Sequence, residues 1–198
     1  MAAEKPQGNE ESYTTDVEYD VVFTSVRYCN YFAKRTMLEK MIIDALAIFI
    51  AQYLYLIVLL VAAVFFFLQP KTVKKSMVVC GAIIAPVAFI LSRISSYFYY
   101  DPRPFVVGHF VPLIAHTADN GFPSDHVLLT GAVAMIVWFY DKKWSTFLSI
   151  LALFIGASRV YVGVHHATDI VGSIVMTIVA SLIYWFTVGR RKALKESK

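Results

Sequence analysis

The segment "SRVYVGVHHATD", residues 158–169, holds the residues whose types and spacing best fit a catalytic site. His165 and Asp169 are four residues apart, so at the start of a helix they share a face and can form a hydrogen bond. A carboxylate bound to one ring nitrogen fixes the tautomer of an imidazole and stabilises its positive charge. The other ring nitrogen is then free to attack an electrophile, which makes His165 a candidate nucleophile.

Two other short segments supply groups that suit an anionic substrate. The segment "DPRPF" contains Arg103, and "PSDH" contains Ser124 and His126. The guanidinium groups of Arg103 and Arg159, together with a short hydroxyl and nearby backbone N–H groups, can form a pocket for a tetrahedral oxyanion. His126 adds a second titratable imidazole. A nucleophile, an orienting carboxylate, an anion clamp and a proton donor are the groups that phosphoryl transfer requires.

The composition predicts that these groups lie in an integral membrane protein. Of the 198 residues, 58% are apolar and only 16% are charged, whereas soluble domains carry about a quarter charged residues. Several windows stay apolar for about 20 residues, enough to cross a bilayer core of about 30 Å. The formal net charge of +4 is ordinary for a membrane protein with basic loops and gives no reason to expect a nucleic-acid partner.

The apolar windows predict an all-α bundle in a single domain, residues 17–190. Five transmembrane helices are expected, at about 41–68, 76–99, 124–140, 144–161 and 168–188. A mixed segment at 17–37, with charged residues among Val, Tyr and Phe, suits an amphipathic helix in the membrane interface. Residues 1–16 are polar and lack the apolar core of a signal peptide, so we expect a flexible tail. Residues 191–198 are expected to form a basic cytoplasmic tail.

Basic residues in the loops predict the orientation in the cell membrane. Those that follow the first, third and fifth expected spans fall on one side, which should be cytoplasmic: Lys71, Lys74, Lys75, Lys142, Lys143, Arg190, Arg191, Lys192, Lys195 and Lys198. The N-terminal segment then lies outside despite its own basic residues, which conflicts with the same rule. The three segments with catalytic potential gather at the opposite, extracytoplasmic end.

The motifs "RP", "PSDH" and "SR-x5-H-x3-D", in this order, resemble the three signature motifs of the type 2 phosphatidic acid phosphatase superfamily. The resemblance extends over about residues 75–188. The fuller segments "YDPRPF", "FPSDH" and "SRVYVGVHHATDIVGS" look most like the bacterial undecaprenyl pyrophosphate phosphatases of the bacitracin-resistance type. The resemblance implies hydrolysis of a polyprenyl diphosphate lipid, which recycles the carrier lipid for cell-wall synthesis.

The resemblance also assigns roles by position. His165 would form a phosphohistidine while Asp169 holds its ring, and His126 would protonate the leaving oxygen and then deprotonate the attacking water. The phosphoryl oxygens would be held by Arg103, Arg159 and Ser124. No metal and no cofactor are expected, because the arginines neutralise the charge that Mg²⁺ neutralises in kinases.

Two positions depart from the superfamily pattern. Seven residues before Arg103, where the pattern has a lysine, this sequence has Ser96. Arg93 lies one helical turn earlier and could replace the lysine as a phosphate-binding cation, or it could be an arginine that extends toward the membrane interface. Asp125 stands where the pattern has a glycine, and could still contribute its backbone N–H to the phosphate pocket.

Several alternatives remain open from the sequence. Arg159 and Asp169 could form a structural ion pair, and His166 suits an interfacial or supporting position. His109 and His116 are expected to be solvated in a long loop, although either could touch a diphosphate. A phosphatidate or phosphatidylglycerophosphate phosphatase and a lipid phosphotransferase are rival activities. A transporter fits less well, because the polar groups gather at one end. The oligomeric state stays open, a homo-oligomer included.

Overall fold

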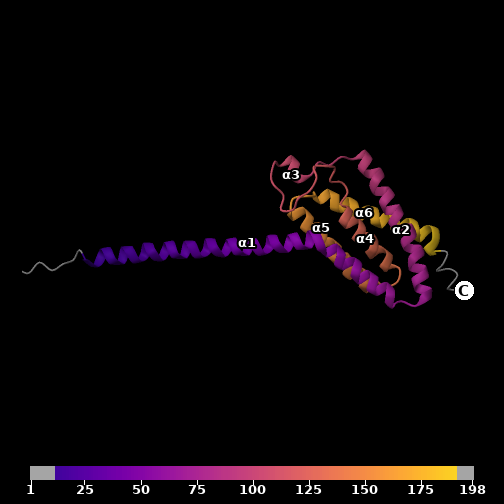
Figure 1. Cartoon of the computed structure of the whole chain (residues 1–198), viewed down its shortest axis with the longest axis horizontal. Helices are drawn as coiled ribbons and strands as arrows, with labels where there is room; N and C mark the ends of the chain where they lie inside the picture. Colours follow the sequence, from indigo (N-terminus) through magenta and orange to yellow (C-terminus); the bar gives the residue numbers. More distant parts are fainter. Residues whose placement is uncertain (1–11, 191–198) are drawn as a thin grey trace, which may run out of the picture. The chain divides into compact units, whose positions relative to one another are not determined.

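The chain is all-α, as predicted. The computed structural model describes the backbone of residues 12–190 and the side chains of residues 36–190. Within that range there is no strand, and one isolated bridge joins Pro102 and Asn120. The elements are α1 (Ser12–Leu68), α2 (Lys71–Phe98), α3 (Pro104–Val107), α4 (Asp125–Trp138), α5 (Lys142–Tyr161), α6 (Ala167–Tyr184) and the π-helical turn η1 (Trp185–Gly189) (Figure 1).

The N-terminal region differs from the expected division into a tail, an interfacial helix and a span. The backbone forms one continuous helix from Ser12 to Leu68. The amphipathic character expected for 17–37 depends almost entirely on side chains that lie outside the described residues. The expected tails at residues 1–11 and 191–198 also lie outside the described residues. The chain divides into two compact units at Ile43, and the helical bundle is the unit that begins at Asp44.

Among the residues that the structure describes, four helical stretches are long and apolar enough to cross a membrane: Thr36–Leu68, Lys71–Phe98, Lys142–Tyr161 and Ala167–Gly189. The remaining expected span, 124–140, corresponds to α4, which has only 14 residues. At 1.5 Å per residue it is about 21 Å long, shorter than the hydrocarbon core of a bilayer. It packs against α2, α5 and α6, so α4 is the central helix of the bundle.

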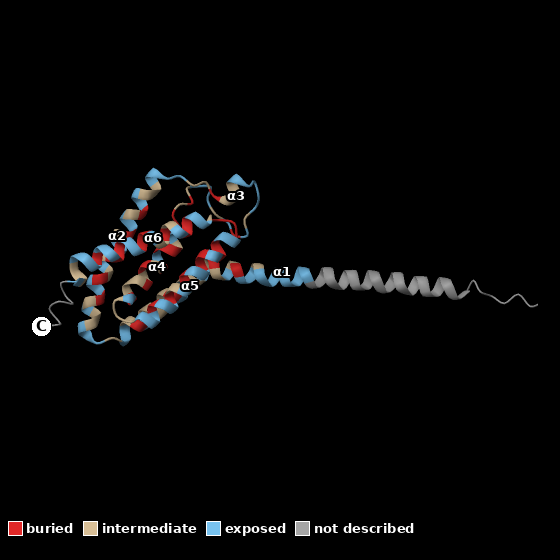
Figure 2. Ribbon diagram, turned by 180° about the vertical axis from the view of Figure 1, so that it is seen from behind, coloured by how far each residue is buried: buried red, intermediate tan, exposed pale blue. Residues whose placement is uncertain are grey.

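The bundle core has two main layers, and α4 contributes to both. On one side Val127 of α4 packs with Val58 of α1 and with Leu148 and Ile155 of α5. On the other side the core contains Ile84 of α2, Leu128 of α4, and Met176 and Ala180 of α6. Large apolar side chains such as Phe67, Ile90, Phe154 and Leu182 are exposed, and exposed positions, pale blue in Figure 2, occur along the helices of the bundle. Such a surface suits contact with lipid.

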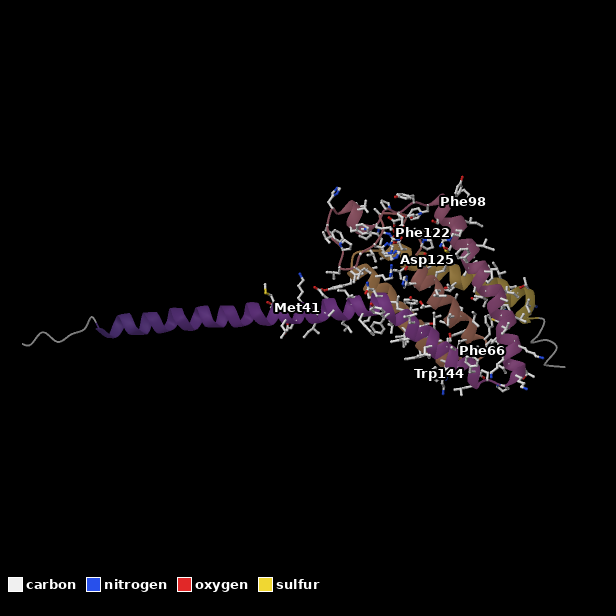
Figure 3. All side chains as sticks on the ribbon, viewed as in Figure 1. Met41, Phe66, Phe98, Phe122, Asp125 and Trp144 are labelled. Atoms are coloured by element: carbon white, nitrogen blue, oxygen red, sulfur yellow. The ribbon has the colours of Figure 1, made fainter. Side chains whose placement is uncertain are left out.

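The order of the helices brings four helix ends to one end of the bundle. Phe98, Phe122 and Asp125 lie at this end, whereas Phe66 and Trp144 lie at the other (Figure 3). The first end therefore receives the C-terminus of α2, the N-terminus of α4 and the connections from α2 to α4. The α5–α6 turn joins them through the hydrogen bond from Ser124 N to Asp169 O (3.4 Å).

A close helix crossing at Gly156 holds α5 against α6 and α4. A Cβ atom at this position would lie 2.6 Å from Ile170 Cγ2 and 3.3 Å from Val127 Cγ2. Only a residue without a side chain fits there, because neither neighbour is the far end of a flexible chain. Gly81 on α2 is a contrasting helical glycine, where a Cβ would be 3.6 Å from Ile136 Cδ1, an ordinary contact.

We expect Gly156→Ala to destabilise the bundle by about 1–3 kcal/mol, since the added methyl group overpacks the crossing. The measurement is thermal unfolding in detergent. Gly81→Ala is the matched control and should keep or raise the midpoint, because alanine favours a helix over glycine by about 1 kcal/mol. Equal midpoints for the two variants would contradict the packing described at Gly156.

Candidate active site

His165 and Asp169 form a buried pair at the start of α6. His165 Nδ1 lies 3.0 Å from Asp169 Oδ2, and the same oxygen accepts a hydrogen bond from His166 N at 2.9 Å. The exposed fractions of the two side chains are 3% and 0%. A Cβ at Gly121 would lie 3.0 Å from Asp169 Oδ2, so the backbone before α4 also confines this carboxylate.

The surroundings of His165 favour the neutral imidazole. Burial lowers the pKa of His165, the hydrogen bond to Asp169 opposes this effect, and the positive charges of Arg159 and Arg103 lower the pKa further. Because a carboxylate accepts from Nδ1, the ring proton is assigned to Nδ1 and the lone pair to Nε2. Arg103 Nη1 lies 3.4 Å from that Nε2. A neutral imidazole with an unprotonated Nε2 is the form that can act as a nucleophile.

Arg103 is held rigidly although it lies on the connection after α2. Its side chain is buried, its Nε donates to Asp119 Oδ1 at 2.7 Å, and its Nη1 donates to Val164 O at 2.8 Å. Desolvation raises the pKa of Asp119, but hydrogen bonds from Arg103 and Thr117 outweigh it and lower the pKa. Asp119 is therefore a carboxylate at neutral pH, and it orients the guanidinium next to His165.

Arg159 lies in the last turn of α5 and is 3% exposed. Its Nη1 donates to Ala51 O of α1 at 3.2 Å, and its Nη2 lies 3.2 Å from His116 Nε2. Its Nε has no hydrogen-bond partner among the described residues. Arg159 therefore does not form the structural ion pair with Asp169 that the sequence analysis kept as an alternative. Asp169 Oδ2 instead binds His165 and His166.

Ser124 is the N-cap residue of α4 and is fully buried. Its hydroxyl oxygen, like Arg159 Nε, has no partner among the described residues. Ser173 Oγ lies 2.9 Å from both Ser124 O and Asp169 O, so one hydroxyl links the starts of α4 and α6. This link fixes "PSDH" against the segment that carries His165.

A cavity of about 180 Å³ opens at this end of the bundle. It brings together six of the site residues expected from the sequence: Arg93, Arg103, Asp125, His126, Arg159 and His165. Ser124 and Asp169 do not line it; Asp169 lies behind His165, and Ser124 adjoins the lining residues Pro123 and Asp125. The lining also includes Ser96, His116, Asp119, Asn120 and Phe122.

His126 lies in the first turn of α4, and its ring is half-buried. The edge-to-face contact with Tyr55 of α1, at 4.9 Å between ring centroids, holds the imidazole at the cavity wall. The backbone around it is fixed by Thr130, whose hydroxyl donates to His126 O at 2.7 Å. His126 on α4 and His165 in the α5–α6 turn thus face one cavity.

Arg93 and Asp125 pair with each other at the cavity. Arg93 Nη2 donates to Asp125 Oδ1 at 3.0 Å, and both side chains are more than half exposed. Beside them, at the position of the absent lysine, Ser96 Oγ and Ser96 O both lie 3.1 Å from Asn120 Nδ2. The Asp125 carboxylate therefore neutralises part of the positive charge of Arg93, so that less of this charge is available to attract a bound anion.

Two residues of the site, His116 and Asp119, were not expected to take part. Both belong to the connection between α3 and α4, where sequence spacing gives no geometric constraint. They contact the two buried arginines, Arg159 and Arg103. The only signal in the sequence for either residue was that His116, in a long loop, could touch a diphosphate.

One group near the site has the composition of a metal site. Ligand atoms of Asp101, His166 and Asp169 lie within 4.8 Å of one another. Asp101 Oδ1 is 3.2 Å from His166 Nδ1, and Asp101 Oδ2 accepts a hydrogen bond from Thr168. None of the three lines the cavity, so a cation there would sit behind His165 and apart from the pocket.

The fold and the cavity together define a helical membrane protein with a cationic, histidine-lined pocket at one end. The sequence profile of the PAP2 superfamily matches residues 77–193. The chain therefore belongs to the PAP2 superfamily, as its motifs predicted, and the four span-length helices in its described part make it a multi-pass membrane protein.

Named relatives cover most of the chain. Undecaprenyl-diphosphatase BcrC of Bacillus subtilis (strain 168) is 30% identical over 145 residues, 73% of this chain and 74% of its own. YbjG of Escherichia coli (strain K12) is 35% identical over 153 residues, 74% of this chain and 76% of its own.

A solved structure supports the same fold. The crystal structure of LpxE from Aquifex aeolicus has a TM-score of 0.58 with 23% identity, over 70% of this chain and 84% of its own. At this level of identity the similarity concerns the arrangement of helices.

We expect Asp125→Asn to raise the affinity for orthophosphate by up to about fivefold, since an exposed ion pair of this kind is worth up to about 1 kcal/mol. Arg93 would then be free to face the anion. The measurement is titration calorimetry in detergent. Arg93→Gln should weaken binding, whereas Lys143→Gln, which removes a charge at the other end of the bundle, should leave it unchanged. Weaker binding by Asp125→Asn would contradict this account of the pair.

Proposed function

We propose that the protein is a polyprenyl diphosphate phosphatase that releases phosphate from a lipid diphosphate through a phosphohistidine on His165. The observation that carries the proposal is a pair of buried donors without a hydrogen-bond partner among the described residues: Nε of Arg159, which lines the cavity, and Oγ of Ser124, which adjoins its lining. An unsatisfied buried donor costs about 1–3 kcal/mol, so both groups are poised for an acceptor. A phosphoryl group, with several acceptor oxygens, would satisfy them beside His165.

In the first step His165 Nε2 attacks the terminal phosphorus, and the bond from phosphorus to the bridging oxygen breaks. The leaving lipid monophosphate takes a proton from His126, which the negative charge of the bound substrate helps to protonate. Asp169 keeps the proton on His165 Nδ1 and stabilises the positive ring. Arg103, Arg159 and Ser124 bind the phosphoryl oxygens as negative charge spreads over them.

In the second step water attacks the phosphohistidine on the face left by the lipid. His126 accepts the proton of the water. The P–N bond breaks, orthophosphate leaves, and His165 returns to the neutral form with its proton on Nδ1. No step requires a metal ion, because two buried guanidinium groups already neutralise the anion.

The place of the cavity in the bundle supports a lipid substrate. A polyprenyl chain stays in the bilayer, since each CH₂ contributes about 0.8 kcal/mol to membrane partitioning. Only its headgroup can meet the protein outside the hydrocarbon core, and the cavity lies at the ends of the helices. The relative named undecaprenyl-diphosphatase supports a lipid diphosphate as the substrate.

We further propose that this cavity faces the extracytoplasmic side. The lysines that follow α1 and those at the start of α5 lie at the helix ends away from the cavity, and basic loops favour the cytoplasm. On the outer face the reaction would recycle the carrier lipid of wall synthesis. By removing the diphosphate form of the lipid, it would confer resistance to bacitracin.

The first test compares substrates. In detergent, and with undecaprenyl diphosphate and phosphatidate at equal surface concentration, we expect kcat/KM to favour the diphosphate. Its leaving group, a lipid monophosphate, is a weaker base than the alkoxide that leaves phosphatidate.

Release of phosphate should be the same with and without EDTA. Preference for phosphatidate would replace the proposed substrate, and loss of activity in EDTA would implicate Asp101, His166 and Asp169 as metal ligands.

The second test concerns the nucleophile. We expect His165→Ala to lower phosphate release from undecaprenyl diphosphate by more than about 1,000-fold, because the covalent route is lost. His109→Ala is the matched control, an exposed histidine outside the cavity lining, and should retain full activity. Brief incubation of the wild type with ³²P-labelled substrate, followed by alkaline quenching, should trap an acid-labile phosphoprotein. Full turnover by His165→Ala would rule out the assigned chemistry.

A further inference from the structure

The connection between α3 and α4 places a third histidine in the active-site cavity. His116 is half-buried and lines the cavity. Its Nε2 lies 3.2 Å from Arg159 Nη2, and its ring centroid lies 6.3 Å from that of His165. Because residues 116 and 159 are far apart in the sequence, this contact exists only in the folded bundle.

The direction of the hydrogen bond fixes the chemical state of His116. A guanidinium group has only donors, so Arg159 Nη2 must donate and His116 Nε2 must accept. The ring proton then lies on Nδ1, which faces Thr117 O at 3.4 Å. An imidazolium would present N–H at both nitrogens and could not accept. The contact therefore requires neutral His116.

The two contacts use two of the five N–H donors of Arg159 and leave the others for a ligand, among them the one on Nε. Its Nη1 donates to Ala51 O, its Nη2 donates to His116, and its Nε is buried without a partner among the described residues. Two anchors on opposite sides, one from α1 and one from the connection between α3 and α4, set the plane of the guanidinium. Its orientation determines where Nε points.

We propose that neutral His116 is a positioning residue that holds Arg159 so that this guanidinium binds a phosphoryl oxygen of the substrate. Protonation of His116 removes the acceptor and places two cations side by side. The affinity of the pocket for a phosphoryl group therefore falls as the pH falls. The inference rests on the proposed function only in taking a phosphoryl group as the ligand of Arg159.

The charged and titratable groups around His116 support the neutral form at neutral pH. They are Arg103 from the α2–α3 connection, Asp119 from its own connection, His126 of α4, Arg159 of α5 and His165 before α6. Burial lowers the pKa of His116, and Arg103 and Arg159 lower it further, against the opposing effects of the Thr117 carbonyl and Asp119. The acceptor is thus present at pH 7 and is lost at lower pH.

Two variants distinguish a positioning role of His116 toward Arg159 from a general contribution of His116 to the stability of the fold. Glutamine at 116 offers a carbonyl oxygen near the place of Nε2 and does not titrate, whereas alanine offers no acceptor. We expect His116→Ala to lower kcat/KM about tenfold, as for the loss of a hydrogen bond to a charged group. His116→Gln should retain activity within about threefold, and the acid limb of its pH profile should move to lower pH. His109→Ala should match the wild type throughout.

Two results would overturn the inference: equal losses in His116→Ala and His116→Gln, or an acid limb that His116→Gln leaves in place. Orthophosphate affinity, measured by calorimetry at pH 7.5 and pH 5.5, provides a readout that does not depend on the lipid substrate. We expect the wild type to lose affinity at the lower pH and His116→Gln to lose less. If the wild type hydrolyses no lipid diphosphate, the proposed function fails, while this binding comparison still decides the role of His116.

Discussion

The hydrogen bond between His165 Nδ1 and Asp169 Oδ2 is the contact on which the site depends. A fully buried carboxylate is costly unless it is paired, and Asp169 Oδ2 also accepts a backbone N–H at the start of α6. The helix N-terminus adds a favourable partial positive charge. The carboxylate is thereby fixed, and it fixes in turn the tautomer and direction of His165. Ser173 extends the same support to the start of α4.

The two arginines impose a second constraint, because guanidinium groups buried in the bundle need acceptors. Backbone carbonyls of Val164 and Ala51 supply some of them, and Asp119 and His116 supply the others. His116 and Asp119 of the connection between α3 and α4 are therefore part of the pocket. Asp119 and His116 bind N–H groups of Arg103 and Arg159 that a phosphate would not contact. The remaining N–H groups of the two arginines give a positively charged surface next to His165.

The sequence predicted some elements of the fold better than others, for identifiable reasons. The apolar runs of α2, α5 and α6 are bounded by charged or turn residues, so their positions were close to those observed. The predicted span at 124–140 was too long, because Phe139 and Tyr140 continue the apolar pattern after the helix has ended at Trp138. Helix α1 is not interrupted between 37 and 41, where the sequence predicted the end of one segment and the start of the next, although the two compact units of the chain meet nearby at Ile43.

The sequence by itself determined the helical membrane class, the superfamily and the pairing of His165 with Asp169, because hydropathy and i, i+4 spacing act over short stretches of chain. Only the tertiary structure decided which groups meet across the bundle. Arg159 contacts Ala51 and His116, and Asp125 contacts Arg93, through connections whose course no local pattern specifies. These contacts depend on how the helices pack around α4, and that packing sets the direction of each charged side chain.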